Sequence, residues 1–127
     1  MEPSRLHELN KLAGEFCGKK LTGQFSHGGE RWVYASYEDE CTMQYTQWNP
    51  SENHEQAAEV KAMLREKAIE HESRYDSLLN KYLIRMSKPK MAITVSTKIT
   101  GYDESELIAL LLAVEAMRKE GMNRDNL

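Results

Sequence analysis

The chain has 127 residues, the usual length of one domain, and a chain of this size can bury a core without disulfides or metal. Hydrophobic residues make up 40% of the sequence and charged residues 29%, which is ordinary for a soluble globular protein. The net charge of −3 is too small to indicate a nucleic-acid-binding protein. Nucleic acid is therefore not expected as a partner.

The two cysteines and the apolar runs bear on location. Cys17 and Cys41 lie far apart and form no Cys-x-x-Cys pair, which favours free thiols in a reducing cytosol over a disulfide. The chain does not begin with a basic segment followed by an apolar one, so no secretory signal is predicted. The longest apolar run, Leu107–Val114, is far shorter than the ~20 residues that a membrane-spanning helix requires. We expect a cytoplasmic protein with no membrane partner.

The first segment has the pattern of an amphipathic helix. Apolar residues recur at spacings of three and four from Leu6 to Phe16. Ser4 is placed to cap this helix, and Gly18 is placed to end it.

Three strands are predicted in the next part of the chain. Residues typical of strands at 21–25 and 32–37 flank a segment with two glycines at 28–29, which predicts a hairpin whose glycines supply the turn. A third strand is predicted at 41–47.

A helix is predicted in the middle of the chain. Ser51 or Asn53 can cap it, and Gln56, three residues after Asn53, can complete a capping box. The helix is predicted to reach about Glu72. Residues 73–80 fit either more helix or a loop, because no Gly or Pro interrupts them.

Alternating apolar residues at 82–86 and 91–99 predict a second hairpin. Together the elements predict an α+β layered sandwich, in which a mainly antiparallel sheet of four or five strands is covered by about three helices. Residues 1–121 are expected to form one domain, and residues 122–127 a flexible tail.

The last helix has clear ends and an unusual middle. Asp103 and Glu106 form a capping box, and Gly121 follows its basic last turn. Residues Leu107–Val114 are apolar around most of the helix circumference, so another element or a second chain must cover them. We expect a homodimer that uses this segment, with cover from within the chain as the alternative.

The order of these segments resembles a family of small phage proteins, the phage ABA sandwich domain. The resemblance rests on Leu6–Gly18, on Tyr45–Asn53 leading into the helix Ala57–Leu64, and on Ser105–Met117. It implies a layered αβ fold and an origin among phage or prophage accessory proteins, and it carries over no catalytic residue. Many such proteins counter host defences, which is an analogy by origin and not by site.

Residues 77–102 contain five basic residues and no acidic residue. This segment therefore has a local positive field, although the net charge of the chain is negative. These candidate partner-binding residues are Lys81, Arg85, Lys88, Lys90 and Lys98. On paired strands, Lys81 and Arg85 share one face and could dock on an acidic protein. The alternative is a sheet edge that lysines protect against aggregation.

A second candidate site is the start of the middle helix. An exposed indole there could stack on a base while free helix amides hold an anion, which would allow the protein to sequester a nucleotide signal. The residues assigned to this ligand site are Trp48, Asn49, Ser51, Asn53 and Lys98. The alternative is that the aromatic residue belongs to the core.

No catalytic or metal-binding pattern is found. The histidines His7, His27, His54 and His71 have no ligand spacing, so no metal or cofactor is expected. Ser51 is better explained as a helix cap than as a nucleophile for His54. A small nucleotide-acting enzyme would need His54, Glu55 or the acidic cluster Glu38–Glu40 in one cleft.

We therefore expect a non-enzymatic, phage-encoded accessory binding protein. It would counter a host defence either by docking on a host protein or by sequestering a nucleotide signal. The alternatives are a small nucleotide-acting enzyme and a structural phage protein.

Overall fold

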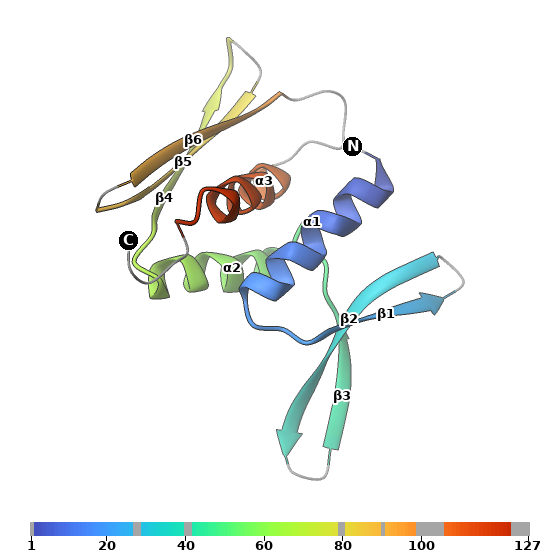
Figure 1. Ribbon diagram of the computed structural model, residues 1–127. Coiled ribbons are helices and arrows are strands. Elements are labelled where there is room, and N and C mark those ends of the chain that lie inside the picture. Colours follow the sequence, from blue (N-terminus) through green and yellow to red (C-terminus); the bar gives the residue numbers. More distant parts are fainter. Residues whose placement is uncertain are drawn as a thin grey trace.

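Figure 1 shows the computed structural model of the chain, in which three helices pack with two β-sheets. The structure describes residues 2–26, 29–39, 42–78, 81–89, 91–98 and 106–122. In chain order the elements are α1 (Pro3–Phe16), β1 (Leu21–Ser26), β2 (Gly29–Asp39), β3 (Thr42–Gln47), α2 (His54–Glu66), β4 (Glu70–Asp76), β5 (Lys81–Lys88), β6 (Met91–Lys98) and α3 (Glu106–Lys119). The predicted α+β class, with antiparallel strands and three helices, is confirmed.

The strands form two sheets of three, with the orders β1-β2-β3 and β4-β5-β6. The predicted single sheet of four or five strands is thus divided into two sheets, and the prediction did not include β4. In the first sheet, β1 pairs with Gly29–Tyr34 of β2 and β3 pairs with Val33–Asp39. The two hairpins therefore share only the centre of β2, and Figure 1 shows them diverging from that point.

The hydrophobic core is centred on α3, which packs against α1 and against β5 and β6 (Figure 1). Its buried residues are Leu107, Ile108, Ala109, Leu110, Leu111, Ala113, Val114 and Met117. The apolar circumference of this helix is thus covered by elements of the same chain. The predicted dimer contact at Leu107–Val114 is not supported, because these side chains are at most 8% exposed, apart from the partly buried Leu112.

The helix α1 passes close to Leu21 of β1 and to Trp48 at Gly14. A Cβ atom at this position would lie 2.9 Å from the indole Nε1 of Trp48 and closer still to the side chain of Leu21. Contacts that short require neighbouring atoms to move, so the missing side chain allows the helix to pack against Trp48.

The ends of α1 follow one prediction and contradict another. The helix begins at Pro3, whose missing N–H suits the first helical position, and Glu2 at the N-cap makes no side-chain bond. The prediction of Ser4 as the cap is therefore wrong, because Ser4 already lies inside the first turn. Gly18 ends the helix as predicted, with a φ of +75°.

The helix α2 begins where it was predicted to begin. Asn53 is its N-cap, and its side-chain oxygen accepts a hydrogen bond from the backbone N–H of Gln56 at 3.0 Å. The Gln56 side chain does not complete the capping box. Instead its Oε1 accepts from the Asn49 N–H at 2.7 Å and its Nε2 donates to the Gln47 carbonyl at 2.6 Å. Gln56 therefore ties the helix to the end of β3.

The helix α2 ends at Glu66 and not near Glu72 as predicted. Ala68 has a φ of 59°, the left-handed conformation that commonly ends a helix, although glycine usually occupies it. The chain then reverses into β4, so residues 70–76 form a strand and not a helix or loop.

The second predicted hairpin is confirmed as β5 and β6. Gly121, with a φ of +75°, follows α3 as predicted. The predicted flexible tail began at Met122, but the side chain of Met122 is fully buried in the core. The other tail residues, 123–127, lie outside the described residues, as do the predicted cap Asp103, the turn glycine Gly28 and the cysteine Cys41. Within the described part of the chain, no helix has the length and apolar character needed to cross a bilayer.

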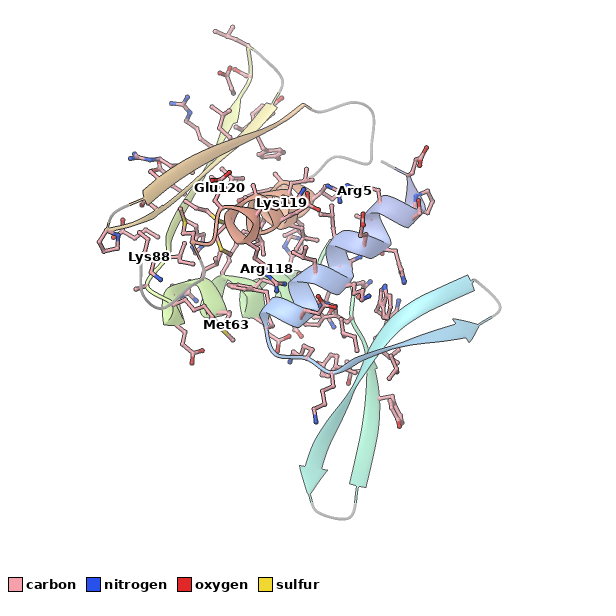
Figure 2. All side chains as sticks on the ribbon, in the orientation of Figure 1. Arg5, Met63, Lys88, Arg118, Lys119 and Glu120 are labelled. Atoms are coloured by element: carbon pink, nitrogen blue, oxygen red, sulfur yellow. The ribbon has the colours of Figure 1, made fainter. Side chains whose placement is uncertain are left out.

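An ion pair joins α1 to α3. The guanidinium of Arg5 donates to both carboxylate oxygens of Glu115, each at 2.6 Å, and Figure 2 labels Arg5 and Arg118 along this contact. Arg118 donates from α3 to the Leu12 carbonyl of α1 at 3.1 Å. The hydrogen bonds from Arg5 hold the pKa of the Glu115 carboxyl below its usual 4.5, and the pair raises the pKa of Arg5 further above its usual value.

Replacing Arg5 with methionine should lower the free energy of unfolding by about 1 kcal/mol at pH 7, a modest loss because the Arg5 side chain is 36% exposed and solvent screens the pair. Because the folded pKa of Glu115 is depressed, the stabilisation is present above pH 4.5 and is lost as the pH falls through the folded pKa. Urea unfolding of both proteins from neutral to acidic pH measures this. A difference that does not shrink in acid would contradict it. Lys11→Met, which removes an exposed pair at 4.0 Å, is the control.

Candidate functional site

Trp48, the centre of the predicted nucleotide site, is a core residue. It is 1% exposed, and its indole Nε1 donates to the carbonyl of Asn10 at 2.8 Å. Tyr34 meets it edge to face, with ring centroids 5.8 Å apart. An indole enclosed in this way has no free face on which a base could stack, so its assignment as a ligand contact is wrong.

The polar groups near the start of α2 are also occupied within the chain. Ser51 is buried: its Oγ accepts from Asn10 Nδ2 at 3.0 Å, and its backbone N–H donates to Asn10 Oδ1 at 3.1 Å. The Asn49 N–H and the Asn53 side chain bond to Gln56, as described above. The amides assigned to an anion therefore hold α1, β3 and α2 together.

The structure assembles only part of the predicted ligand site. Trp48, Asn49 and Ser51 line one cavity of about 180 Å³ together with His7 and Trp32. This volume is below the ~300 Å³ at which ligand pockets begin. Lys98 belongs to β6, in the other sheet, and its side chain lies outside the described residues.

The predicted partner-binding residues differ in their surroundings. Arg85 is exposed on β5, while Lys88 is half-buried and donates from Nζ to the carbonyl of Met122 at 3.3 Å. Figure 2 labels Lys88 at that end of the sheet. Lys81 lies at the start of β5, and the side chains of Lys81 and Lys90 lie outside the described residues.

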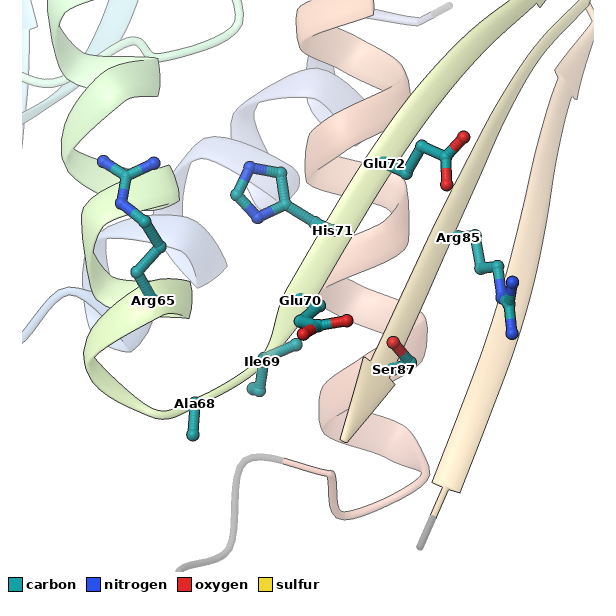
Figure 3. A pocket seen from close by; sticks show the side chains of 8 residues that line it. All are labelled: Arg65, Ala68, Ile69, Glu70, His71, Glu72, Arg85 and Ser87. Carbon is teal, nitrogen blue, oxygen red and sulfur yellow. The ribbon is translucent and has the colours of Figure 1, made fainter. Parts of the chain in front are cut away.

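A groove, here called the α2–β4 groove, opens where α2 turns into β4. It has a volume of about 760 Å³ and is lined by Arg65, Ala68, Ile69, Glu70, His71, Glu72, Arg85 and Ser87. Figure 3 shows Arg65 of α2 and His71 of β4 facing the same space. Glu72 and Arg85 lie on the other side of β4, so the groove wraps around this strand.

The charge state of His71 decides what the groove can bind. Partial burial, followed by the charges of Lys61 and Arg65, lowers the pKa of His71 below its usual 6.5. The imidazole is therefore neutral at pH 7, and Arg65 is the cation on that wall. This wall suits a hydrogen-bonding or aromatic group beside a cation.

The outward surface of the second sheet carries a second shallow cavity of about 240 Å³, lined by Glu72, Arg74, Leu83 and Arg85. We name these four residues the Arg85 face. The strand register places Glu72 opposite Arg85 and Arg74 opposite Leu83. Among the described residues, none of the three charged members forms an ion pair.

Comparisons with known proteins give no identification. Neither the protein-family models, nor the curated proteins, nor the solved structures contain a match to this chain.

The residues considered for catalysis are not brought together in the described part of the chain. His54 and Glu55 are exposed at the start of α2, and the side chains of Glu38–Glu40 lie outside the described residues. The described residues contain no group of three His, Cys, Asp or Glu side chains that could hold a metal ion. Cys17 is a free thiol, as predicted, and burial raises its pKa to about 11, so it is protonated at neutral pH.

Sequence reasoning missed Arg65, His71, Glu72 and Arg74 as members of a site. All four depend on β4, which the helical pattern of residues 54–72 concealed. The only available signal was the β-type residue Tyr75 in a segment of otherwise polar residues.

Proposed function

We propose that the protein is a non-enzymatic binding protein that docks on an acidic protein partner through the Arg85 face. The observation that carries this is the pair of exposed arginines beside the half-buried Leu83: Arg74 lies opposite it on β4, and Arg85 follows it on the same face of β5. Both guanidinium groups are without an ion pair in the described part of the chain. An apolar centre flanked by arginines is the composition that favours a protein interface.

The charges on the second sheet give the docking a direction. The β4 residues on the face opposite to His71 are mostly acidic. Residues 81–98, which contain β5 and β6, include basic residues and no acidic one. A partner would place its carboxylates over β5, where Arg85 can form two parallel hydrogen bonds to one carboxylate. Glu72 would favour a basic group beside them.

The biological setting of this binding rests on the resemblance to small phage accessory proteins. We propose that the partner is a host protein and that docking on it counters a host defence. Sequestration of a nucleotide at Trp48 is not proposed, because that side chain is buried.

Quantitative capture from bacterial lysate tests the proposal. Immobilised wild-type protein should retain a defined set of acidic proteins, and raising the salt to about 0.5 M should release them. Arg85→Glu should reduce their capture about tenfold, equivalent to about 1.4 kcal/mol. Lys20→Glu changes the net charge equally at an exposed site outside both sheets and should leave capture unchanged. Equal losses with both variants, or capture insensitive to Arg85→Glu, would refute the Arg85 face as the binding surface.

A further inference from the structure

The strand β4 has a free edge. It is the outermost strand of the second sheet and pairs with β5 along one side only. No strand of the described residues pairs with its other side, and five of its seven residues are exposed. The backbone N–H and C=O groups of such an edge form a template for another extended strand.

We infer that this edge pairs with β4 of a second copy of the chain, which would join two sheets of three strands into one of six. The two strands would run antiparallel about a two-fold axis that passes beside Ser73. A two-fold axis brings the same surface of each copy together. Residues that lie equally far before and after the axis then face each other, so these residues must be compatible in charge and size.

The sequence of β4 meets that requirement at its centre. With the axis at Ser73, Glu72 of each copy lies opposite Arg74 of the other, which makes two cross-strand ion pairs. Moving the axis by one residue would place Glu72 opposite Glu72 or Arg74 opposite Arg74. At the two ends of the pairing, Glu70 lies opposite Asp76, so two acidic pairs at the ends oppose part of the attraction at the centre.

The other face of the strand supplies a second match. His71 lies opposite Tyr75 of the second copy in this register, and both project from the face that Ser73 turns toward Glu106 of α3. Tyr75 is 49% exposed, and its ring lies 5.3 Å from that of Tyr82 on β5, which leaves the rest of the ring open to the second copy.

The α2–β4 groove gives this tyrosine a place. Because His71 lines the groove, the ring of the second copy's Tyr75 would enter it next to Arg65. A volume of about 760 Å³ holds a phenol ring, and the guanidinium of Arg65 can lie against its face. The free edge, the exposed tyrosine and the groove thus have one explanation. In the dimer Glu72 and Arg74 pair across the axis, and Leu83 and Arg85 of each copy stay on the outward surface of the joined sheet for a partner.

Sedimentation equilibrium of the purified protein over a range of concentrations tests the inference. The wild type should be a dimer, and Arg74→Glu, which places two carboxylates opposite each other across the axis, should weaken the dimer at least tenfold. The charge-swapped double variant Glu72→Arg/Arg74→Glu restores opposite charges across the axis and should restore the dimer. Lys20→Glu should have no effect, and circular dichroism should show that all variants fold.

Ser73→Cys provides a second test of the register. Residues directly opposite each other across antiparallel strands have Cα atoms roughly 4.5–5.5 Å apart, within the range for a disulfide. Oxidation of this variant should give a covalent dimer, and peptide mapping should assign the cross-link to the substituted position in both copies. A monomeric wild type overturns the inference, as does a dimer unaffected by Arg74→Glu. Failure of the double variant to restore the dimer overturns the register.

Discussion

Replacing Leu111 with alanine is expected to lower the free energy of unfolding by about 3–5 kcal/mol. Leu111 belongs to α3, which packs against α1 and against the second sheet, and its side chain is fully buried. Because α3 packs against α1, β5 and β6, the surrounding elements cannot move into the space without losing their other contacts. The loss therefore includes the transfer free energy of the removed methyl groups and the cost of a cavity.

Leu112 is the matched control, because it is the next residue of the same helix and is only partly buried. Leu112→Ala should cost about 1–2 kcal/mol, since part of the side chain is in contact with water and the space it leaves opens to solvent. Urea unfolding followed by circular dichroism measures both values. Equal losses for the two variants would mean that α3 is not the centre of the core.

Asn10→Ala is expected to lower the free energy of unfolding by about 2–4 kcal/mol. Asn10 is 7% exposed and Ser51 is 5% exposed, and two hydrogen bonds join them. The variant would leave both the hydroxyl and the backbone N–H of Ser51 buried without a partner, and each such group costs about 1–3 kcal/mol. The bond from Trp48 to the Asn10 carbonyl is retained, because it uses the backbone.

A double-mutant cycle separates this network from general damage to α1. Ser51→Ala removes one of the two bonds, so the double variant Asn10→Ala/Ser51→Ala should cost clearly less than the sum of the single variants. Asn53→Ala, which removes the helix cap a few residues away, should cost about 1 kcal/mol and should add to the loss from Asn10→Ala. Additive losses from Asn10→Ala and Ser51→Ala would contradict the proposed coupling.

Local patterns predicted those elements whose boundaries carry a chemical signal. Gly18 and Gly121 follow the ends of helices, where the left-handed conformation that glycine adopts easily is enough to stop the helix. Asn53 begins a helix through a single side-chain hydrogen bond. The strict alternation in β6 predicted a strand for the same reason.

The strand β4 carried no such signal. Its sequence from Glu70 to Asp76 is polar on both faces and continues the charged composition of α2. The left-handed residue just after the helix is Ala68, a good helix former whose side chain gives no sign of this conformation. The groove and the Arg85 face could not be predicted without this strand.

The predicted nucleotide site failed for a different reason. Trp48 follows a strand and precedes a capped helix, a position that suits either a binding surface or a core. The partner that decides between them is the carbonyl of Asn10, 38 residues earlier in the chain. Local sequence contains no information about a contact at that distance.

The central position of α3 also determines when the protein can fold. This helix follows all six strands in the chain, yet it fills the space between α1 and β5–β6. While the ribosome is still making the part of the chain before α3, the buried side chains of Leu9 on α1 and Ile84 on β5 therefore lack the helix that covers their elements. The nascent chain must stay unfolded or be protected until α3 emerges, and closure of such distant contacts favours slow folding.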